Sequence, residues 1–262
     1  DDIQDLDIAE SIFTDKQYDL LCSRYGGYWR YPHLLDFCYL VNPYFPNQRL
    51  KDELAASFER LLTEYPSGQK VNNLLAAKDF GVKQEYILVG NGAAELIKAL
   101  TSQMLGKVGI VRPTFEEYPN RLMPEQVVAY VPQRPDFRYT ADDLMDYFDD
   151  KQIWSLVLIN PDNPTGNYIP YDDCLRLAQW CKEREIVLVI DESFIDFSSE
   201  HPTFLNNAIL AQNDHLVVVK SISKSYGVPG LRLGVLATSN QSLMMNLRRE
   251  MSIWNINSFC EC

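Results

Sequence analysis

A lysine between small hydroxyl residues is the group in this sequence best suited to covalent chemistry. Lys224 follows Ser221 and Ser223 in the Gly- and Pro-rich loop 221–234, SISKSYGVPGLRLG, which separates two apolar runs. A lysine becomes nucleophilic when it is partly desolvated or lies near another cation, because either lowers its pKa. Arg232 supplies such a cation, and the serine hydroxyls could hold an anion beside it. The alternative is an ordinary solvated loop lysine, so other groups must support the chemistry.

Further polar turns follow other apolar runs. The turn 90–95, GNGAAE, opens an expected helix, whose free amides could bind a phosphate. Asn163 lies in the turn 160–166, and Asp191 directly follows the apolar run 186–190. A carboxylate there needs a proton donor or a cation, or else it caps a helix, and the sequence weighs the two interpretations equally.

Strand-like and helix-like patterns alternate from residue 86 to residue 251. The expected strands are 86–89, 108–111, 126–131, 155–159, 186–190, 216–219 and 231–236, and the expected helices are 48–65, 71–77, 93–104, 115–123, 141–149, 171–184, 204–212 and 241–251. Continuous Val, Ile and Leu strands between amphipathic helices predict an α/β fold, with a mostly parallel central sheet and helices on both faces. Ligands of such folds bind beyond the carboxyl ends of the strands, where the polar turns fall.

Lysine, an anion cup, a buried carboxylate, an amide and an aromatic ring together suit pyridoxal 5′-phosphate. The chain also resembles fold-type I pyridoxal-phosphate enzymes of the class I/II aminotransferase family, in the branch of histidinol-phosphate aminotransferase and threonine-phosphate decarboxylase. The resemblance rests on Ser-x-Ser-Lys-x-Tyr-Gly-x-Pro-Gly-Leu-Arg-x-Gly at 221–234 and Asn-Pro-x-Asn-Pro-Thr-Gly at 160–166, and it extends over residues 34–258.

The resemblance implies a role for each candidate residue. Lys224 would form the Schiff base and later move the proton between Cα and C4′, while Asp191 would pair with the pyridine nitrogen. Asn163 would bind the 3′-oxygen of the ring, and Phe115 would stack on it, with Tyr118 a weaker candidate. The phosphate would be held by Gly92, Ala93, Ala94, Ser221, Ser223 and Arg232.

The resemblance also implies partners. Tyr65 of Glu-Tyr-Pro matches the family tyrosine that reaches the phosphate of the other subunit, which implies a homodimer with shared active sites. Asn42 of Asn-Pro-Tyr, and Tyr28, are expected on the substrate side. The activity implied is amino transfer from a small-molecule donor, an amino acid or a phosphorylated amine, to a keto-acid acceptor.

Phe194 departs from the family pattern, because many members carry a tyrosine three residues after the aspartate. The run 191–197, DESFIDF, resembles the decarboxylase branch. Decarboxylation of a phosphorylated amino acid therefore stays open as an alternative. A third interpretation is a cofactor-binding or dimerisation fragment of a larger multidomain protein, without turnover.

Two regions are expected along the chain. Residues 1–46 are aromatic-rich and predict an N-terminal arm with a substrate-side segment, and residues 47–262 predict the pyridoxal-phosphate-binding large domain. The family match breaks off at 254–258, before the family's C-terminal small domain. The chain is therefore expected to bind the cofactor with weak or no turnover.

Composition argues against several other classes. The formal net charge of −12 disfavours a nucleic-acid partner. The six cysteines and three histidines are scattered without the spacing of a metal site or a disulfide framework. No apolar run is long enough to span a membrane, and a cytoplasmic protein is expected. The Gly-x-Gly-x-x-Gly motif of dinucleotide-binding folds does not follow the first expected strand.

Overall fold

The computed structural model describes residues 26–30, 35–37, 39–199 and 202–262. It divides the chain into two compact units, Asp1–Leu40 and Val41–Cys262. Most of the expected N-terminal region 1–46 lies outside the described residues. Within the first unit a 3-10 helix spans Tyr28–Arg30, and the rings of Tyr28 and Tyr39 lie 5.2 Å apart.

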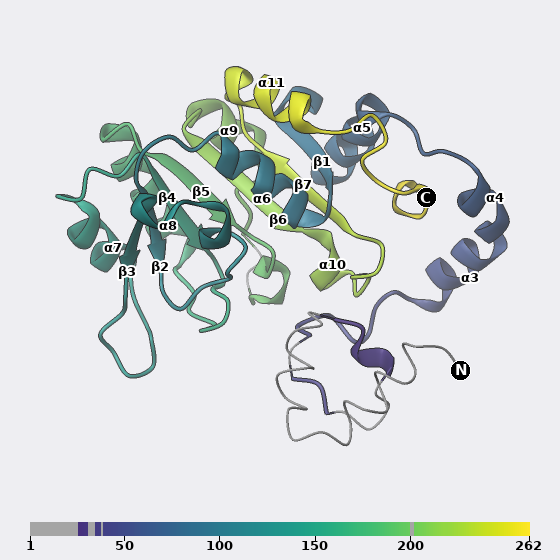
Figure 1. Ribbon diagram of the computed structural model, residues 1–262, viewed down its shortest axis with the longest axis horizontal. Coiled ribbons are helices and arrows are strands. Elements are labelled where there is room, and N and C mark those ends of the chain that lie inside the picture. The colour runs from purple at the N-terminus through teal and green to yellow at the C-terminus, as the bar shows by residue number, and fades with distance from the viewer. Residues whose placement is uncertain (1–25, 31–34, 38, 200–201) are drawn as a thin grey trace. The chain divides into compact units, whose positions relative to one another are not determined.

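A seven-stranded sheet forms the centre of the second unit, in the order β1-β7-β6-β5-β4-β2-β3 (Figure 1). The strands are β1 (Ile87–Asn91), β2 (Val108–Val111), β3 (Val127–Tyr130), β4 (Ser155–Ile159), β5 (Val187–Asp191), β6 (Leu216–Ser221) and β7 (Leu233–Ala237). β7 runs antiparallel to both of its neighbours, and every other pair is parallel. The mostly parallel sheet predicted from the sequence is confirmed.

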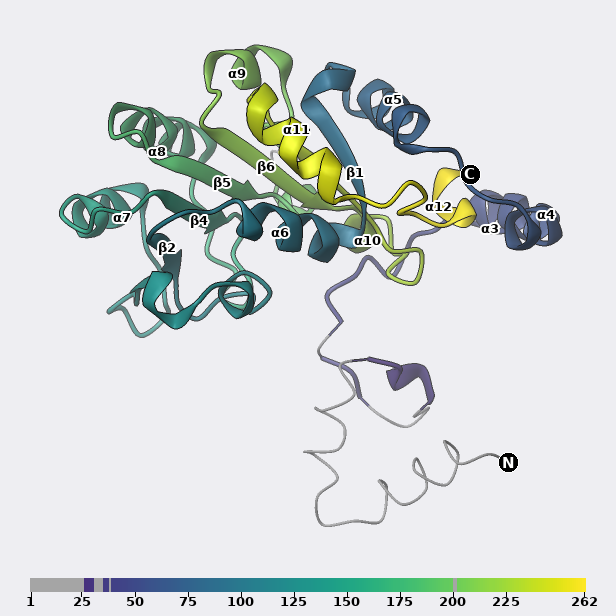
Figure 2. The same cartoon turned by 45° about the horizontal axis from the view of Figure 1, so that its top comes forward.

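Helices cover both faces of this sheet (Figure 2). Side chains of α5 (Gln69–Phe80), α7 (Ala141–Phe148), α8 (Tyr171–Glu183) and α9 (Asn207–Gln212) join one apolar core, and those of α6 (Gly92–Ser102) and α11 (Gln241–Glu250) join the other. The strands feed both cores because successive side chains point to opposite faces. On β6, Val218 belongs to the first core and Val217 and Val219 belong to the second.

The helix expected at 48–65 is two helices, α3 (Gln48–Ala56) and α4 (Phe58–Thr63). Ser57 separates them, with a φ of −102° and a ψ of 2°. Serine interrupts helices readily because its hydroxyl competes for backbone hydrogen bonds. Neither α3 nor α4 has a buried residue.

The prediction of a helix at 115–123 is wrong. The segment contains only the 3-10 turn η3 (Pro119–Arg121). Proline in a helix interior lacks the amide donor and its ring collides with the preceding turn, so Pro119 prevents a continuous helix. Phe115 and Tyr118 therefore lie on an irregular segment that follows β2.

Two kinds of feature are absent from the part of the chain that the structure describes. None of its helices is both long and apolar enough to cross a bilayer. Among the same residues, no three His, Cys, Asp or Glu side chains gather where they could hold a metal ion.

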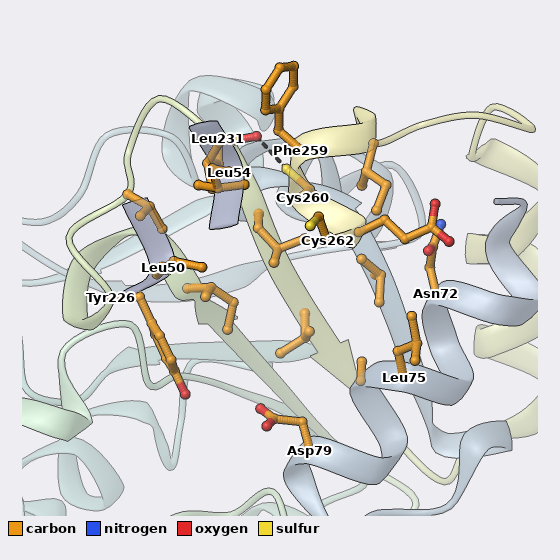
Figure 3. Close-up of a pocket in the computed structure, with 18 of the residues that line it drawn as sticks. Leu50, Leu54, Asn72, Leu75, Asp79, Tyr226, Leu231, Phe259, Cys260 and Cys262 are labelled. Carbon is orange, nitrogen blue, oxygen red and sulfur yellow. Dashed lines mark hydrogen bonds between the residues drawn. The ribbon is translucent and has the colours of Figure 1, made fainter. Parts of the chain in front are cut away.

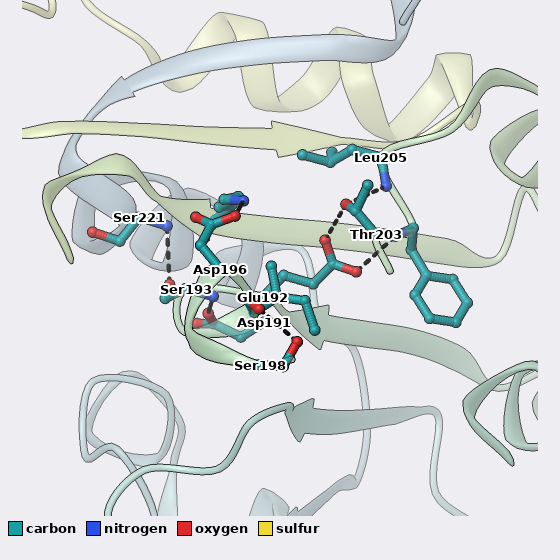
Figure 4. Close-up of polar contacts among 11 residues, drawn as sticks. Asp191, Glu192, Ser193, Asp196, Ser198, Thr203, Leu205 and Ser221 are labelled. Carbon is teal, nitrogen blue, oxygen red and sulfur yellow. Dashed lines mark hydrogen bonds and ion pairs between the residues drawn. The ribbon is translucent and has the colours of Figure 1, made fainter. Parts of the chain in front are cut away.

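One carboxyl group lies deep inside the second unit. Glu192 is only 1% exposed, and it accepts hydrogen bonds from the Thr203 hydroxyl at 2.5 Å and the Phe204 amide at 2.7 Å (Figure 4). Burial raises the pKa of Glu192 to about 7, although both hydrogen bonds and the charge of Lys220 oppose the rise. In the folded protein this carboxyl therefore keeps its proton up to a higher pH than it does in the unfolded chain.

Glu192→Gln is expected to flatten the pH dependence of stability. The carboxyl binds its proton more tightly in the folded protein, with a pKa of about 7 against 4.5, so the free energy of unfolding falls as the pH rises through this interval. The difference between the two pKa values corresponds to about 3 kcal/mol of unfolding free energy. Glutamine does not titrate, so the variant would not lose this stability as the pH rises. Urea denaturation at about pH 5 and about pH 8 measures the difference. Parallel pH profiles for the variant and the wild type would contradict this account, and Glu250→Gln, at an exposed position, is the control.

Candidate active site

The polar turns meet at the sheet edge where β1, β4, β5 and β6 end. A cavity of about 110 Å³ opens there. Its lining residues are Ala93, Ala94, Phe115, Ile159, Asn163, Asp191, Ser193, Phe194, Ser221, Lys224 and Arg232. Eight of these eleven residues are ones that the sequence predicts for the cofactor. Parallel strands place their carboxyl ends together, which explains why turns far apart in the sequence share one cavity.

Lys224 lies on the one-turn helix α10 (Ile222–Ser225), where the sequence predicted a loop. α10 begins directly after β6, and the Gly- and Pro-rich part of the expected loop follows it. The lysine Nζ lies 5.8 Å from the centroid of the Phe194 ring. A rigid strand thus leads straight into the turn that carries the amine, and an apolar ring faces that amine.

Asp191 is held by two donors at the end of β5. The Tyr118 hydroxyl donates to Oδ2 at 2.8 Å, and the Ser193 amide donates to Oδ1 at 2.9 Å. The side chain is 2% exposed, and this burial raises the pKa of Asp191, while the hydrogen bonds from Ser193 and Tyr118 and the charge of Lys224 oppose the rise. The short 3-10 turn η5 (Ile195–Phe197) follows. Asp191 therefore does not cap an α-helix, and of the two interpretations the buried carboxylate at a ligand edge agrees with the geometry.

Tyr118 differs from its predicted place. It was a weaker candidate for stacking on a ring, but it is completely buried and does not line the cavity. Burial, followed by the charge of Asp191, raises the pKa of Tyr118 well above its usual value, so the phenol keeps its proton. Phe115, by contrast, lines the cavity. The sequence signal for the Tyr118 contact is that a carboxylate at the end of an apolar strand needs a donor.

Sequence reasoning also missed Ser193. Its hydroxyl accepts a hydrogen bond from the Ser221 amide at 2.9 Å, while its own amide binds Asp191 (Figure 4). Ser193 thus connects the end of β5 to the end of β6. Its position two residues after Asp191 was the only signal in the sequence.

Close backbone packing forms the anion cup. Gly92, at the start of α6, has a φ of +75°, and a Cβ there would lie 2.7 Å from Arg232 Nη2. A Cβ on Gly234 would lie 2.5 Å from the Ala93 amide nitrogen. Glycine at these two positions lets the guanidinium of Arg232 and strand β7 approach the amino end of α6, where helix amides favour an anion.

The Ser223 hydroxyl, which the family resemblance assigns to the phosphate, has no use within the protein itself. Ser223 is 3% exposed, and its Oγ has no hydrogen-bond partner among the described residues. Ser223 does not line the cavity, but it lies between Ser221 and Lys224, which do. Buried hydroxyls are almost always bonded, and a bound phosphate would supply the partner of this one. The chain's residues therefore fit the phosphate of the predicted cofactor, and the site fits its ring through Phe115, Asn163 and Asp191.

Asn42 lies against the lysine turn. Its backbone amide donates to the Lys224 carbonyl at 2.8 Å, and its side-chain Nδ2 donates to the Ser225 carbonyl at 2.9 Å. Its Oδ1 accepts from the Tyr44 amide at 2.9 Å. The side chain is thus engaged with backbone groups, and it holds the turn in place. Its predicted contact with substrate stays a prediction.

Gly92, Ser223 and Tyr65 are predicted residues of the second unit that do not line the cavity. The Tyr65 side chain is 77% exposed, and its ring stacks on Trp254 with 4.3 Å between the centroids. Its role across a dimer stays a prediction. Tyr28 belongs to the first unit, and its role on the substrate side also stays a prediction.

A larger cavity of about 380 Å³ also borders α10 (Figure 3). Ile222 and Tyr226 line it, whereas Ser221 and Lys224 line the smaller one. Its walls are mainly apolar and contain no lysine, arginine or histidine. Among the described residues, the lysine and the arginine that could bind a cofactor therefore line the smaller cavity.

Comparison with known proteins supplies the family. The model of aminotransferase class I and II matches residues 40–260. The chain belongs to this family. Its members bind pyridoxal 5′-phosphate, and both threonine-phosphate decarboxylases and histidinol-phosphate aminotransferases are among its relatives. The resemblance inferred from the sequence motifs is confirmed.

Two curated relatives and one solved structure define the similarity. The chain is 36% identical to the CMP-5′-(3-aminopropyl)phosphonate synthase of Streptomyces rubellomurinus, with 94% of this chain and 38% of that protein covered. It is 33% identical to the L-serine phosphate decarboxylase of Sulfurospirillum multivorans, with 87% and 60% covered. The histidinol-phosphate aminotransferase structure from Clostridium acetobutylicum matches with a TM-score of 0.73 at 24% identity, covering 87% and 67%. The chain thus spans 38% to 60% of the length of these two curated relatives.

Tyr118→Phe is expected to lower the free energy of unfolding by about 1.5–3 kcal/mol, the usual range for a hydrogen bond to a charged group. Tyr147→Phe is the matched control, because its hydroxyl donates to the neutral Ala129 carbonyl at 2.8 Å. That change is expected to cost about 0.5–1.5 kcal/mol. Urea denaturation of both variants measures the difference, and equal costs would show that Asp191 does not depend on Tyr118.

Ser223→Ala is expected to weaken phosphate binding without lowering stability. The change removes a buried hydroxyl that has no partner among the described residues, so unfolding in the absence of ligand should be unaffected or slightly harder. Affinity for pyridoxal phosphate should fall about tenfold, as for one lost hydrogen bond to a charged group. Ser225→Ala is the control, since its hydroxyl is also buried and unpaired among the described residues, and the family resemblance does not assign it to the phosphate. Calorimetric titration measures both, and equal affinities would remove Ser223 from the cup.

Proposed function

We propose that this chain carries the pyridoxal-phosphate site of an enzyme that decarboxylates a phosphorylated amino acid. The observation that carries the proposal is the meeting of Lys224, Asp191 and the anion cup in one cavity. The choice of reaction is supported by 33% identity to an L-serine phosphate decarboxylase. Because the chain spans 60% of that relative, the activity is proposed for the whole protein.

The residues divide the work of holding the cofactor. Lys224 Nζ is the amine that would bind it, the anion cup would hold its phosphate, and Asp191 would keep a proton at its ring nitrogen. Phe115 and Asn163 line the space for its ring. When bound, pyridoxal phosphate withdraws electrons from the bond that breaks at the substrate Cα. Lys224 would then supply a proton to Cα in place of the lost carboxylate.

Phe194 supports decarboxylation over amino transfer. It faces the lysine amine with a ring that cannot donate a hydrogen bond. The family pattern for many aminotransferases has a tyrosine at this place, and the run 191–197 resembles the decarboxylase branch. This residue is therefore the feature of the site that supports decarboxylation as the first proposal.

Amino transfer is the second candidate, and it was the leading interpretation of the sequence. It is supported by the family description and by the similarity to histidinol-phosphate aminotransferases. In that reaction Lys224 would move a proton from Cα, an amino donor would leave as a keto acid, and a keto-acid acceptor would restore the enzyme.

A homodimer with shared sites is part of the proposal. The Tyr65 ring is exposed and does not line the cavity of its own chain. It is therefore available to reach the anion cup of a second subunit, as the family resemblance implies. Sedimentation of the protein with and without cofactor tests this association.

Lys224→Ala is expected to abolish the absorbance band of the Schiff base with pyridoxal phosphate, because the amine that forms this bond is lost. Lys182→Ala, a surface control, should leave the band unchanged. Absorbance titration of the purified chain measures both. A wild-type chain without the band, or a band that persists in Lys224→Ala, would reject the proposed site.

Product analysis of the whole protein distinguishes the two reactions. With O-phosphoserine or O-phosphothreonine as substrate, a decarboxylase releases carbon dioxide and retains the amine. An aminotransferase instead forms a keto acid and needs an acceptor. Keto acid without carbon dioxide would replace the first proposal with the second.

A further inference from the structure

An ion pair with a buried cation lies behind the cavity. Ser221 and Lys220 are successive residues of β6, so their side chains point to opposite faces of the sheet. Ser221 lines the cavity, and Lys220 therefore extends away from it. The Lys220 Nζ lies 2.7 Å from Asp196 Oδ1 and 5.9 Å from the centroid of the Phe80 ring. Lys220 is only 5% exposed, so this cation is largely removed from water.

The pair joins the two segments that carry the site. Asp196 belongs to η5, the turn that follows Phe194, and the Phe197 amide of that turn donates to the Phe194 carbonyl at 3.0 Å. Lys220 belongs to β6, which leads directly into the turn of Lys224. A displacement of Asp196 relative to Lys220 would therefore move Phe194 relative to the amine that it faces.

A second link joins the same segments on the cavity side. There the Ser221 amide donates to the Ser193 hydroxyl at 2.9 Å (Figure 4). The segments 191–197 and 220–224 are thus connected on both faces of the sheet, by a hydrogen bond in front and by an ion pair behind. Two links on opposite sides prevent the segment 191–197 from rotating relative to the segment 220–224, which either link alone would permit.

Stability alone does not account for a pair whose ammonium is buried and whose carboxylate is 33% exposed. Removing two charges from water costs about as much as their attraction returns, and apolar residues of similar size often serve as well. What an ion pair adds is direction, because the carboxylate must meet the ammonium at hydrogen-bond distance. Here the direction of the contact between Lys220 and Asp196 fixes the position of Phe194 relative to Lys224.

We propose that Lys220 and Asp196 are positioning residues, which together hold the Phe194 ring over the Lys224 amine. The inference deepens the proposed function, because it concerns how that site keeps its lysine partly desolvated. A ring held over an amine excludes water from it, which favours the neutral, nucleophilic form, and its face attracts the ammonium, which favours the charged form. Loss of the pair should change both effects and therefore shift the pKa of Lys224.

The test uses Lys220→Met, Asp196→Asn, the double variant, and Lys220→Arg, which keeps the charge. In the cofactor-free protein, the pH dependence of Lys224 acetylation by acetic anhydride, followed by mass spectrometry, measures its pKa. Hydrogen exchange of the peptide 193–198 measures the mobility of the Phe194 segment. Both readouts work whether or not the chain binds pyridoxal phosphate, so failure of the proposed function leaves this test intact.

Each single variant is expected to shift the midpoint for Lys224 by about half a pH unit, in the same direction in both, and to speed exchange of 193–198 roughly tenfold. Because the two residues act as one unit, the double variant should show little further change. Lys220→Arg should restore both values. Arg184→Met breaks a surface pair with Asp149 and should change neither.

Four outcomes would overturn the proposal. They are unchanged values in the folded single variants, additive effects in the double variant, equal effects in Arg184→Met, and faster exchange with an unmoved midpoint. The last would reduce the pair to a structural role. If Lys220→Met does not fold, the comparison of Asp196→Asn with Lys220→Arg decides, since the Asp196 side chain is 33% exposed and tolerates the smaller change.

Discussion

The burial of one carboxylate organises this site. Asp191 ends an apolar strand and is almost inaccessible to water, so the surrounding segments must supply donors for it. Tyr118 comes from the irregular segment after β2, and the Ser193 amide comes from the turn after β5. Satisfying Asp191 thus brings separate parts of the chain to the same sheet edge. A cofactor whose ring nitrogen carries a proton would find a partner there that is already fixed in direction.

At the opposite end of the cavity, glycine residues leave space for a charged side chain. Gly92 and Gly234 allow β7 and the Arg232 guanidinium to approach the amino end of α6. The Ser223 hydroxyl lies nearby without a partner among the described residues. The carboxylate end is therefore satisfied by the protein itself, and the anion end is left for a ligand. Lys224 stands between these two ends.

The sequence predicted the sheet and most of the cavity because both depend on local patterns. Apolar runs locate the strands, and the fold rule places the turns that follow them together. Contacts between distant segments are different. Tyr118 and Asp191 are 73 residues apart, and the helix wrongly expected at 115–123 concealed their meeting. Lys220 and Asp196 are 24 residues apart, and nothing in either local pattern indicates that they pair. Such contacts require the register of β5 against β6, which periodicity does not specify.

The turn α10 has unequal surroundings, and this affects how the lysine can move. On one side Ser221 and Lys224 face a small polar cavity, and on the other Ile222 and Tyr226 face a larger apolar one. Close packing resists displacement, whereas empty apolar space does not. Cavities border the lysine turn on both sides, so packing alone does not fix its place. The two hydrogen bonds from Asn42 to the Lys224 and Ser225 carbonyls therefore act as the brace of the turn.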